Sequence, residues 1–375
     1  MAYIHKFGQV SIICHSFNGN CTEMAVSVNS NDVFIFKVPE VGKGRFSFLH
    51  RLQEHTATVR SIDWGKKEDR IVSCSTDRNA YVWARSDKIW KPTLVILQLN
   101  RAATFVRWSP LENKFAVGSS AKLISVCSFD SNNDFWISKH LKRNINSTIT
   151  CLDWHPDNNV IACGSSDFHV RVFCAYLKSH DAPFKESNWG SKLAFNSLLW
   201  ESEGRLGWVH SVAFSKDGNQ LMWSTHSSAI CLATVDGSHQ PPVVRTIPME
   251  NLPILTLIWA TNKTVIGAGH DCIPYTIFTD NNQLKLGASL DSKEESTANT
   301  SISAKHKFQN IDRVATIESN NSIINSKHKN AINEIRILKG AVGEAQVLST
   351  IGRDGQLVLW DLKTLTQRIS ELKIY

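Results

Sequence analysis

Three short motifs combine side chains that could act as acids, bases or metal ligands. His155-Pro156-Asp157 and Gly269-His270-Asp271 each place an imidazole beside a carboxylate, and Ser215-Lys216-Asp217-Gly218 adds a hydroxyl and an amine. Such groups serve acid–base catalysis or zinc binding when a fold assembles them. However, the first and third motifs follow strand-like segments and contain typical turn residues. His270 lies at the hinge of a repeat described below, so we interpret all three as turns.

No recognisable catalytic motif accompanies these residues. The chain has no Walker lysine motif, no GxSxG elbow and no HExxH helix, and Gly340-Ala-Val-Gly343 lacks the lysine and glycine spacing of a nucleotide site. The sequence does not exclude a catalytic triad whose residues lie far apart in the chain. The sequence therefore predicts no enzyme, no catalytic residues, no cofactor and no metal.

Composition predicts a globular protein of the cytosol. Hydrophobic residues make up 42% and charged residues 20% of the 375 residues, and no apolar stretch approaches the roughly 20 residues of a membrane span. The nine cysteines are an odd number without a CxxC pair, which favours buried thiols in a reducing compartment. A net charge of +7 favours an acidic partner. No secretion signal is recognised at the N-terminus.

A repeated unit is the strongest signal in the sequence. Its clearest copy runs from Glu54-His55 through Val59–Trp64 and Ile71–Asp77 to Asn79–Trp83. This pattern resembles the WD repeat. The resemblance implies a buried hydrogen-bonded network, here assigned to His55, Ser75, Asp77 and Trp83, with Asp167, Asp354 and Trp360 at matching positions of other copies. A buried carboxylate needs such donors, so Asp77 is interpreted as structural.

Aligned copies of the unit predict the architecture. The hinge positions are Ser30, Asp77, Ala121, Asp167, Ser227, Asp271 and Asp354, and the first strands end at Phe17, Trp64, Trp108, Trp154, Phe214, Trp259 and, weakly, Ile337. These hinges predict an all-β fold, a single seven-bladed WD-repeat β-propeller over residues 1–375. The segment Tyr3–Phe7 should supply the outer strand of the last blade, because a ring must cover its strand edges.

Two hinge intervals exceed the 40 to 45 residues of an ordinary blade. One contains an excursion near Ser179–Glu203, and the other contains an insertion at 280–327, between the last two blades, that is rich in Ser, Asn, Lys and Glu. A short amphipathic helix is expected near 303–315, with Ser303 as N-cap. This helix could dock on its own propeller, or it could be an arm that reaches a neighbouring protein; the polar flanks favour the arm.

A narrower resemblance extends almost from end to end. Motifs such as Thr76–Trp83, Trp90–Leu97, Trp189–Lys192, Gly207–His210 and Phe308–Asn310 resemble the WD-repeat (40-kilodalton) subunits of the actin-related-protein 2/3 complex. That family implies a non-catalytic scaffold subunit of a cytoplasmic seven-subunit assembly of the actin cytoskeleton, which nucleates a filament branch on an existing filament.

The resemblance also implies partners. They are the other subunits of the complex, nucleation-promoting factors and the actin filament, with neither nucleic acid nor membrane involved. The expected contact residues in the insertion are Lys305, Lys307, Phe308, Ile311, Arg313 and Val314. The alternative function is a WD-repeat adaptor that binds a linear peptide in its central channel.

Overall fold

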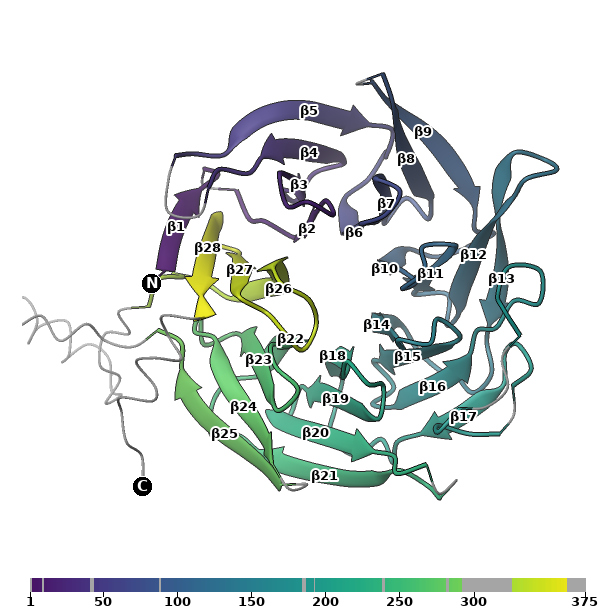
Figure 1. Cartoon of the computed structure of the whole chain (residues 1–375), viewed down its shortest axis with the longest axis vertical. Helices are drawn as coiled ribbons and strands as arrows, with labels where there is room; N and C mark the ends of the chain where they lie inside the picture. The colour runs from purple at the N-terminus through teal and green to yellow at the C-terminus, as the bar shows by residue number, and fades with distance from the viewer. Residues whose placement is uncertain are drawn as a thin grey trace, which may run out of the picture.

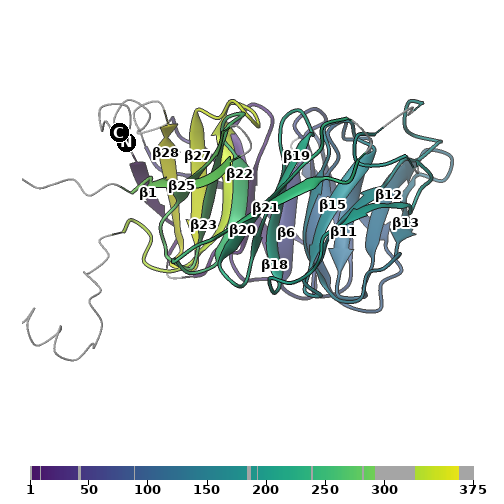
Figure 2. The ribbon, with the colours of Figure 1, turned by 90° about the horizontal axis from the view of Figure 1, so that it is seen from below.

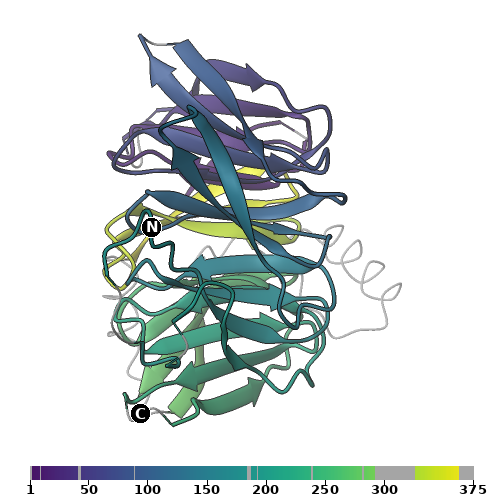
Figure 3. The ribbon, with the colours of Figure 1, turned by 90° about the vertical axis from the view of Figure 1, so that its right-hand side faces the viewer.

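We describe the fold from a computed structural model of the whole chain. The structure describes residues 2–362 except residues 9, 41–43, 88, 184–186, 192, 238–239, 281–282 and 292–325. Antiparallel sheets stand side by side around a common centre, as Figure 1 shows, and the side view in Figure 2 shows that their strands cross from one face of a disc to the other. Figure 3 shows the same disc edge-on from its right-hand side.

Five sheets have four strands each. Their strands are β1 (Ala2–Lys6), β26 (Ile332–Lys339), β27 (Val347–Gly352) and β28 (Gln356–Asp361); β2 (Cys14–Phe17), β3 (Glu23–Ser27), β4 (Asp32–Lys37) and β5 (Ser47–Gln53); β14 (Ile149–Trp154), β15 (Val160–Ser165), β16 (Val170–Cys174) and β17 (Leu198–Glu201); β18 (Val209–Phe214), β19 (Gln220–Thr225), β20 (Ala229–Thr234) and β21 (Val243–Pro248); and β22 (Ile254–Trp259), β23 (Thr264–Gly269), β24 (Tyr275–Asp280) and β25 (Gln283–Ser289).

One sheet has eight strands. It joins β6 (Val59–Trp64), β7 (Arg70–Ser75), β8 (Ala80–Ser86) and β9 (Ile89–Ile96) to β10 (Ala103–Trp108), β11 (Lys114–Ser119), β12 (Ile124–Asp130) and β13 (Phe135–Leu141). Each half is an antiparallel unit of four strands. The two halves meet where β13 pairs parallel with β9, through Trp136 opposite Val95 and Ile137 opposite Ile96.

Burial explains why the strands differ in composition. The second strand of each unit lies between neighbouring sheets, so strands such as β11, β15 and β27 are buried at every residue. Small residues are needed there because sheets approach closely: a Cβ on Gly164 would lie 2.4 Å from a methyl carbon of Val209 in the next sheet. In the fourth strands, such as β21, exposed side chains mostly alternate with partly buried ones, because one face of the strand meets solvent.

The predicted strand ends and hinges agree with this fold. β2, β6, β10, β14, β18 and β22 end at the six aromatic residues assigned to the ends of first strands, and every predicted hinge lies between the second and third strands of its unit. No helix in the described part of the chain is long and apolar enough to cross a lipid bilayer.

The start of the predicted insertion at 280–327 needs correction. Residues Gln283–Ser289 form β25, which pairs with β24 as an ordinary fourth strand. Alternation in this strand is weak, so the sequence pattern alone does not separate it from the polar stretch that follows. The expected helix near 303–315 lies outside the described residues.

The ring closes through its first strand. β1 pairs antiparallel with β28, from Ala2 opposite Trp360 to Lys6 opposite Gln356, and Phe7 N donates to Gly355 O at 2.9 Å. The predicted clasp is therefore confirmed, one residue earlier than the assigned Tyr3–Phe7. Figure 1 shows the purple β1 beside the yellow β28, so the two ends of the described chain complete one sheet.

Deleting residues 2–6 should destabilise the whole ring. The deletion removes the main-chain hydrogen bonds between β1 and β28 and exposes the edge of β28. The free energy of unfolding should fall by about 3–5 kcal/mol, at roughly 1 kcal/mol for each net bond. Thermal unfolding and amide exchange of β28 measure the effect. Ile4→Ala is the control, because the Ile4 side chain is half-exposed. An unchanged melting curve for the deletion would refute the clasp.

Candidate functional site

The predicted hinge network is assembled in the β6–β9 unit. Its connections run from Asp77 in the hinge to His55 before β6 and on to Trp83 in β8: His55 Nδ1 lies 2.9 Å from Asp77 Oδ2, His55 Nε2 lies 2.9 Å from Ser73 Oγ, and Trp83 Nε1 donates to the same oxygen at 2.9 Å. The network assigns a donor proton to Nδ1 of His55, since a carboxylate only accepts. Asp77 Oδ2 also accepts from Thr56 N.

The serine of this network is Ser73, and the assignment of Ser75 is wrong. Ser75 Oγ instead donates to Ala57 O at 2.7 Å and accepts from Asp77 N at 3.2 Å, which supports the turn. Residues two apart in a strand share a face. The alternation of the sequence therefore could not separate Ser73 from Ser75.

A second network of the same form lies in the β26–β28 sheet. Trp360 Nε1 donates to Thr350 Oγ1 at 2.9 Å, Thr350 contacts His328 Nε2 at 2.8 Å, and His328 Nδ1 lies 3.2 Å from Asp354. Asp354 and Trp360 were predicted, whereas His328 and Thr350 were missed. The sequence does contain a signal that identifies His328. It stands four residues before Ile332, the first residue of β26, just as His55 stands four residues before Val59, the first residue of β6.

Asp167 uses a different partner. Its Oδ1 accepts from Arg171 Nη1 at 2.9 Å, and Asn146 N donates to Oδ2 at 3.0 Å. The fully buried Arg171 also pairs with Glu201 at 2.8 Å. An arginine on β16 thus donates to the hinge carboxylate where a histidine donates in the other units, so Asp167 belongs to an ion-pair network.

The pKa values of the hinge aspartates follow their partners. Burial by itself would raise the pKa of Asp77 and of Asp354, but hydrogen bonds from His55 or His328 and from backbone N–H groups outweigh it and lower both. Asp271, without such a histidine, has its pKa raised by burial despite the N–H of Leu252. The carboxylates of Asp77 and Asp354, whose pKa values are lowered by several hydrogen-bond donors, hold their hinge turns in place.

The motifs interpreted as turns also lie in turns. Asp157 Oδ1 accepts from Asn159 N at 2.8 Å, and His155 Nε2 contacts Gly218 O of the neighbouring sheet at 3.1 Å. In the other motif, Asp217 Oδ1 accepts from Asn219 N at 3.2 Å. Within the described residues, no group of three or more His, Cys, Asp or Glu side chains is arranged to hold a metal ion.

Hydrogen bonds join the innermost strand of one unit to that of the next. At six junctions a side-chain oxygen on one strand accepts from a backbone N–H on its neighbour, as the following pairs show: Ser16 with Trp64, Asp63 with Trp108, Asp153 with Phe214, Ser211 with Leu257, Thr256 with Ile335, and Glu334 with His15. Between β10 and β14 the donors are side chains instead: Thr104 Oγ1 donates to Ile149 O, and Trp154 Nε1 donates to Arg107 O. The pair of Glu334 with His15 joins β26 to β2 and so closes the circle. These bonds fix the spacing of the sheets at the ring centre.

An ion-pair network crosses the ring centre. Arg336 on β26 reaches past β2 to β6, where Nη1 donates to Asp63 Oδ1 at 2.9 Å and Nη2 donates to Ile62 O at 3.0 Å. The same guanidinium pairs with Glu334 at 2.9 Å, and Glu334 contacts the buried His15 at 3.1 Å. The charges here satisfy one another.

Asp153 on β14 lies at the same inner ring. Its Oδ2 accepts from Phe214 N at 2.8 Å. Burial raises the pKa of Asp153 to about 6, although Arg107 and two backbone N–H groups oppose the shift. This carboxyl therefore keeps its proton to a higher pH than an exposed aspartate does.

The predicted partner-binding residues cannot be placed in this geometry. Lys305, Lys307, Phe308, Ile311, Arg313 and Val314 all lie outside the described residues.

The fold and its hinge networks define a WD-repeat β-propeller. A family model described as "WD domain, G-beta repeat" matches residues 46–84 and 137–174. The first of these stretches contains His55, Ser73, Asp77 and Trp83, which form the complete network of the β6–β9 unit.

Comparison with known proteins identifies the family within the class of WD-repeat propellers. The chain is 45% identical to actin-related protein 2/3 complex subunit 1A-A of Xenopus laevis, over 99% of both chains. It is 38% identical to subunit 1 of Schizosaccharomyces pombe over 93% of this chain and 96% of that one, and 33% identical to subunit 1A of Arabidopsis thaliana over 98% of each. The chain belongs to the family of actin-related protein 2/3 complex subunit 1.

Removing the hinge carboxylate should test the network. Asp77→Ala should lower the free energy of unfolding by about 2–4 kcal/mol, because His55 and the backbone N–H groups lose their buried acceptor. Asp271→Ala is the matched control at the equivalent hinge without a histidine, and its loss should be smaller. Denaturant unfolding at pH 7 measures both, and equal losses would contradict a special role for the histidine network.

The raised pKa of Asp153 predicts that its contribution to stability falls as pH rises, which is opposite to ordinary acid denaturation. Its folded pKa of about 6 exceeds the ordinary value of 3.8, so the folded state holds the proton more tightly. The contribution of Asp153 is therefore most favourable below pH 3.8 and is lost as pH rises through 6. Relative to Asp153→Asn, the natural chain should lose stability between pH 4 and pH 7, measured by denaturant unfolding. A constant difference would contradict the raised pKa.

Proposed function

We propose that the chain is a non-catalytic scaffold subunit of an actin-related protein 2/3 complex. The observation that carries the proposal is 45% identity along 99% of this chain and 99% of actin-related protein 2/3 complex subunit 1A-A. As such a subunit, the chain would support nucleation and branching of actin filaments in the cytoplasmic actin cytoskeleton. Its proposed partners are the other subunits, nucleation-promoting factors and the actin filament.

The proposed scaffold acts by holding its partners in fixed positions. The eight-stranded sheet counts as two blades, because each half repeats the four-strand antiparallel unit of the other sheets, and the proposed ring then has seven blades. A closed ring loses little conformational entropy on binding, so subunits docked on it are held in one orientation at low cost. This positioning lowers the entropic barrier to forming a filament nucleus.

The polar segment before β26 is the proposed filament contact. We assign this contact to Lys305, Lys307, Phe308, Ile311, Arg313 and Val314. Its cationic side chains suit an acidic actin surface, and its apolar side chains suit a groove. The propeller would set where this segment begins and ends, since β25 and β26 belong to adjacent sheets.

The adaptor alternative is less well supported. A peptide reader needs unpaired polar groups at the ring centre, whereas Arg336, Asp63 and Glu334 are engaged with one another. These pairs favour a structural role for the ring centre, and the outer surfaces are then the places for partners.

Deleting 292–325 should separate assembly from branching. The deletion keeps β25 and β26 intact, so thermal stability and recovery of the complex should stay within error while branch formation falls severalfold. Phe308→Ala with Ile311→Ala should reproduce the loss, and Ser292→Ala with Ser296→Ala, outside the expected helix, serves as control. Branches are counted by fluorescence microscopy of actin filaments. Full branching by the deletion complex would overturn the assigned filament contact.

A further inference from the structure

Two histidines face each other where the first strand of one unit meets its hinge. His210 is the second residue of β18, and His226 follows β19, directly before the hinge residue Ser227. Their rings approach closely, since Nε2 of His210 lies 3.1 Å from Nδ1 of His226. Among the described residues, neither side chain takes part in a hinge network or in the bonds between inner strands. The fold therefore leaves this pair without an evident structural task.

In other units, the residues at these two positions bind the backbone. His210 stands at a bulge, where the register of β18 against β19 shifts, and such a bulge redirects a side chain. At the matching bulges of three other units, a side chain donates to a backbone carbonyl of the neighbouring unit; these side chains are Thr104, Thr150 and Asn333. At the position of His226, Thr76 and Ser166 donate to a carbonyl just before the first strand of their own unit. In the β18–β21 unit both positions carry imidazoles, which contact each other instead.

The distance between the two nitrogens suits a shared metal ion. Two imidazole nitrogens bound to one ion at about 2.0–2.1 Å are about 3.3–3.4 Å apart in a tetrahedral site and about 2.8–3.0 Å apart as neighbours in a square-planar one. The 3.1 Å between His210 Nε2 and His226 Nδ1 lies between these values. The ring that donates the hydrogen bond needs only to move its proton to its other nitrogen, and both lone pairs then face the ion.

The surroundings of the pair favour binding. Burial, and then the neighbouring His226 and His270, lower the pKa of His210 to about 4. His210 is therefore neutral at pH 7, which is the form of histidine that binds metals. The ring of Trp208 lies 5.1 Å from that of His226 at a tilt of 36°, and so restricts its rotation. His226 itself is exposed, so an ion in solution can reach the pair.

A third imidazole lies nearby but is not assigned as a ligand. Burial, and then the Arg353 guanidinium, lower the pKa of His270 in the hinge of the next unit. The positive charge of Arg353 opposes a cation at the His270 ring. A site with two protein ligands also agrees with the described residues, among which no three His, Cys, Asp or Glu side chains are arranged around one ion.

We propose that His210 and His226 bind one divalent transition-metal ion of the zinc and copper type. His210 contributes Nε2, His226 contributes Nδ1, and water molecules fill the remaining positions. Imidazole suits both metals, and copper is the more tightly bound of the two in the general order of divalent ions. The ion ties β18 to the hinge after β19, so its binding stabilises this unit. The site does not depend on the proposed function.

Isothermal titration calorimetry of the purified full chain with Zn²⁺ tests the site. His210→Gln and His226→Gln should each weaken binding about tenfold or more, because loss of even an outer partner of a metal ligand has an effect of that size. His270→Gln should bind Zn²⁺ as the natural chain does. Equal weakening by His270→Gln would overturn the assignment to two histidines, and a natural chain that does not bind Zn²⁺ would overturn the site.

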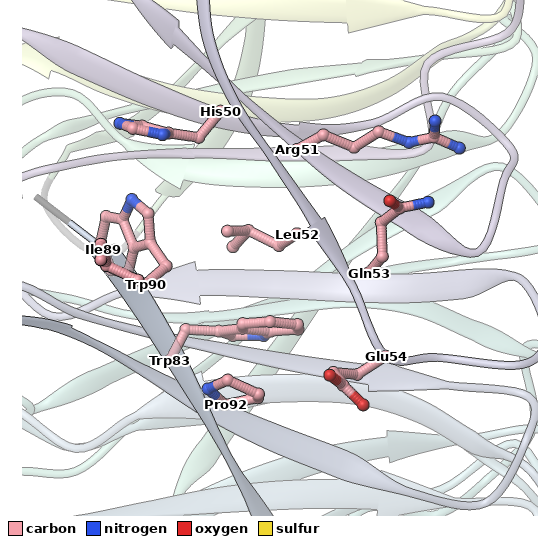
Figure 4. Close-up of a pocket in the computed structure, with 9 residues that line it drawn as sticks. All are labelled: His50, Arg51, Leu52, Gln53, Glu54, Trp83, Ile89, Trp90 and Pro92. Carbon is pink, nitrogen blue, oxygen red and sulfur yellow. The ribbon is translucent and has the colours of Figure 1, made fainter.

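A lone histidine provides the matched control. His50 lines a hollow beside β5 and is the only histidine among the residues that line it, as Figure 4 shows. His50→Gln should therefore leave the affinity for Zn²⁺ unchanged. A loss equal to that of His226→Gln would show that the ion binds adventitiously to accessible imidazoles, and the proposal would fall.

Electron paramagnetic resonance of bound Cu²⁺ counts the nitrogen ligands directly. At one equivalent of Cu²⁺, the natural chain should show two imidazole nitrogens on the ion, and His226→Gln should show fewer. The exposed position of His226 makes this variant the safer of the two, and it carries the test if His210→Gln does not fold. A single nitrogen ligand in the natural chain would contradict the shared site.

Discussion

Closure of the ring is the constraint on which the rest of the structure depends. Each four-strand unit buries its second strand against a neighbouring sheet, so no unit is covered until the circle is complete. Two closures achieve this: β1 pairs with β28 at the rim, and Glu334 accepts from His15 N at the centre. Arg336 adds a link that spans β2 and ties β26 to Asp63. The hinges can therefore vary without opening the ring.

That tolerance is visible in the hinge networks. Complete His–Ser/Thr–Asp–Trp networks stand in the β6–β9 and β26–β28 units, and an arginine replaces the histidine beside Asp167. Asp271 instead accepts from Leu252 N and from the Tyr275 hydroxyl. Polar groups that are fully satisfied stabilise a turn, whereas a half-satisfied network would cost stability. The carboxylates, histidines and serines that first suggested chemistry are thus used inside the fold, and the outer surfaces are left for partners.

Repeat periodicity made much of this fold predictable. Strand ends, hinges and the clasp follow from a pattern that recurs along the chain, and each copy reinforces the others. The sequence does not distinguish Ser73, which belongs to the network, from the assigned Ser75, because residues two apart in a strand share a face, and it does not reveal β25, because alternation in that strand is weak. The contact of Arg336 with Asp63 joins residues 273 apart in the sequence, and no repeat encodes it.

The central claim is that the ring acts by holding other proteins. The most direct measurement is purification of the affinity-tagged full-length chain from native extract, followed by mass spectrometry and determination of the mass of the recovered particle. The account predicts one stable particle that contains two actin-related proteins and several smaller subunits in equal amounts with the tagged chain. Recovery of the chain alone, or with partners that include no actin-related protein, would contradict it.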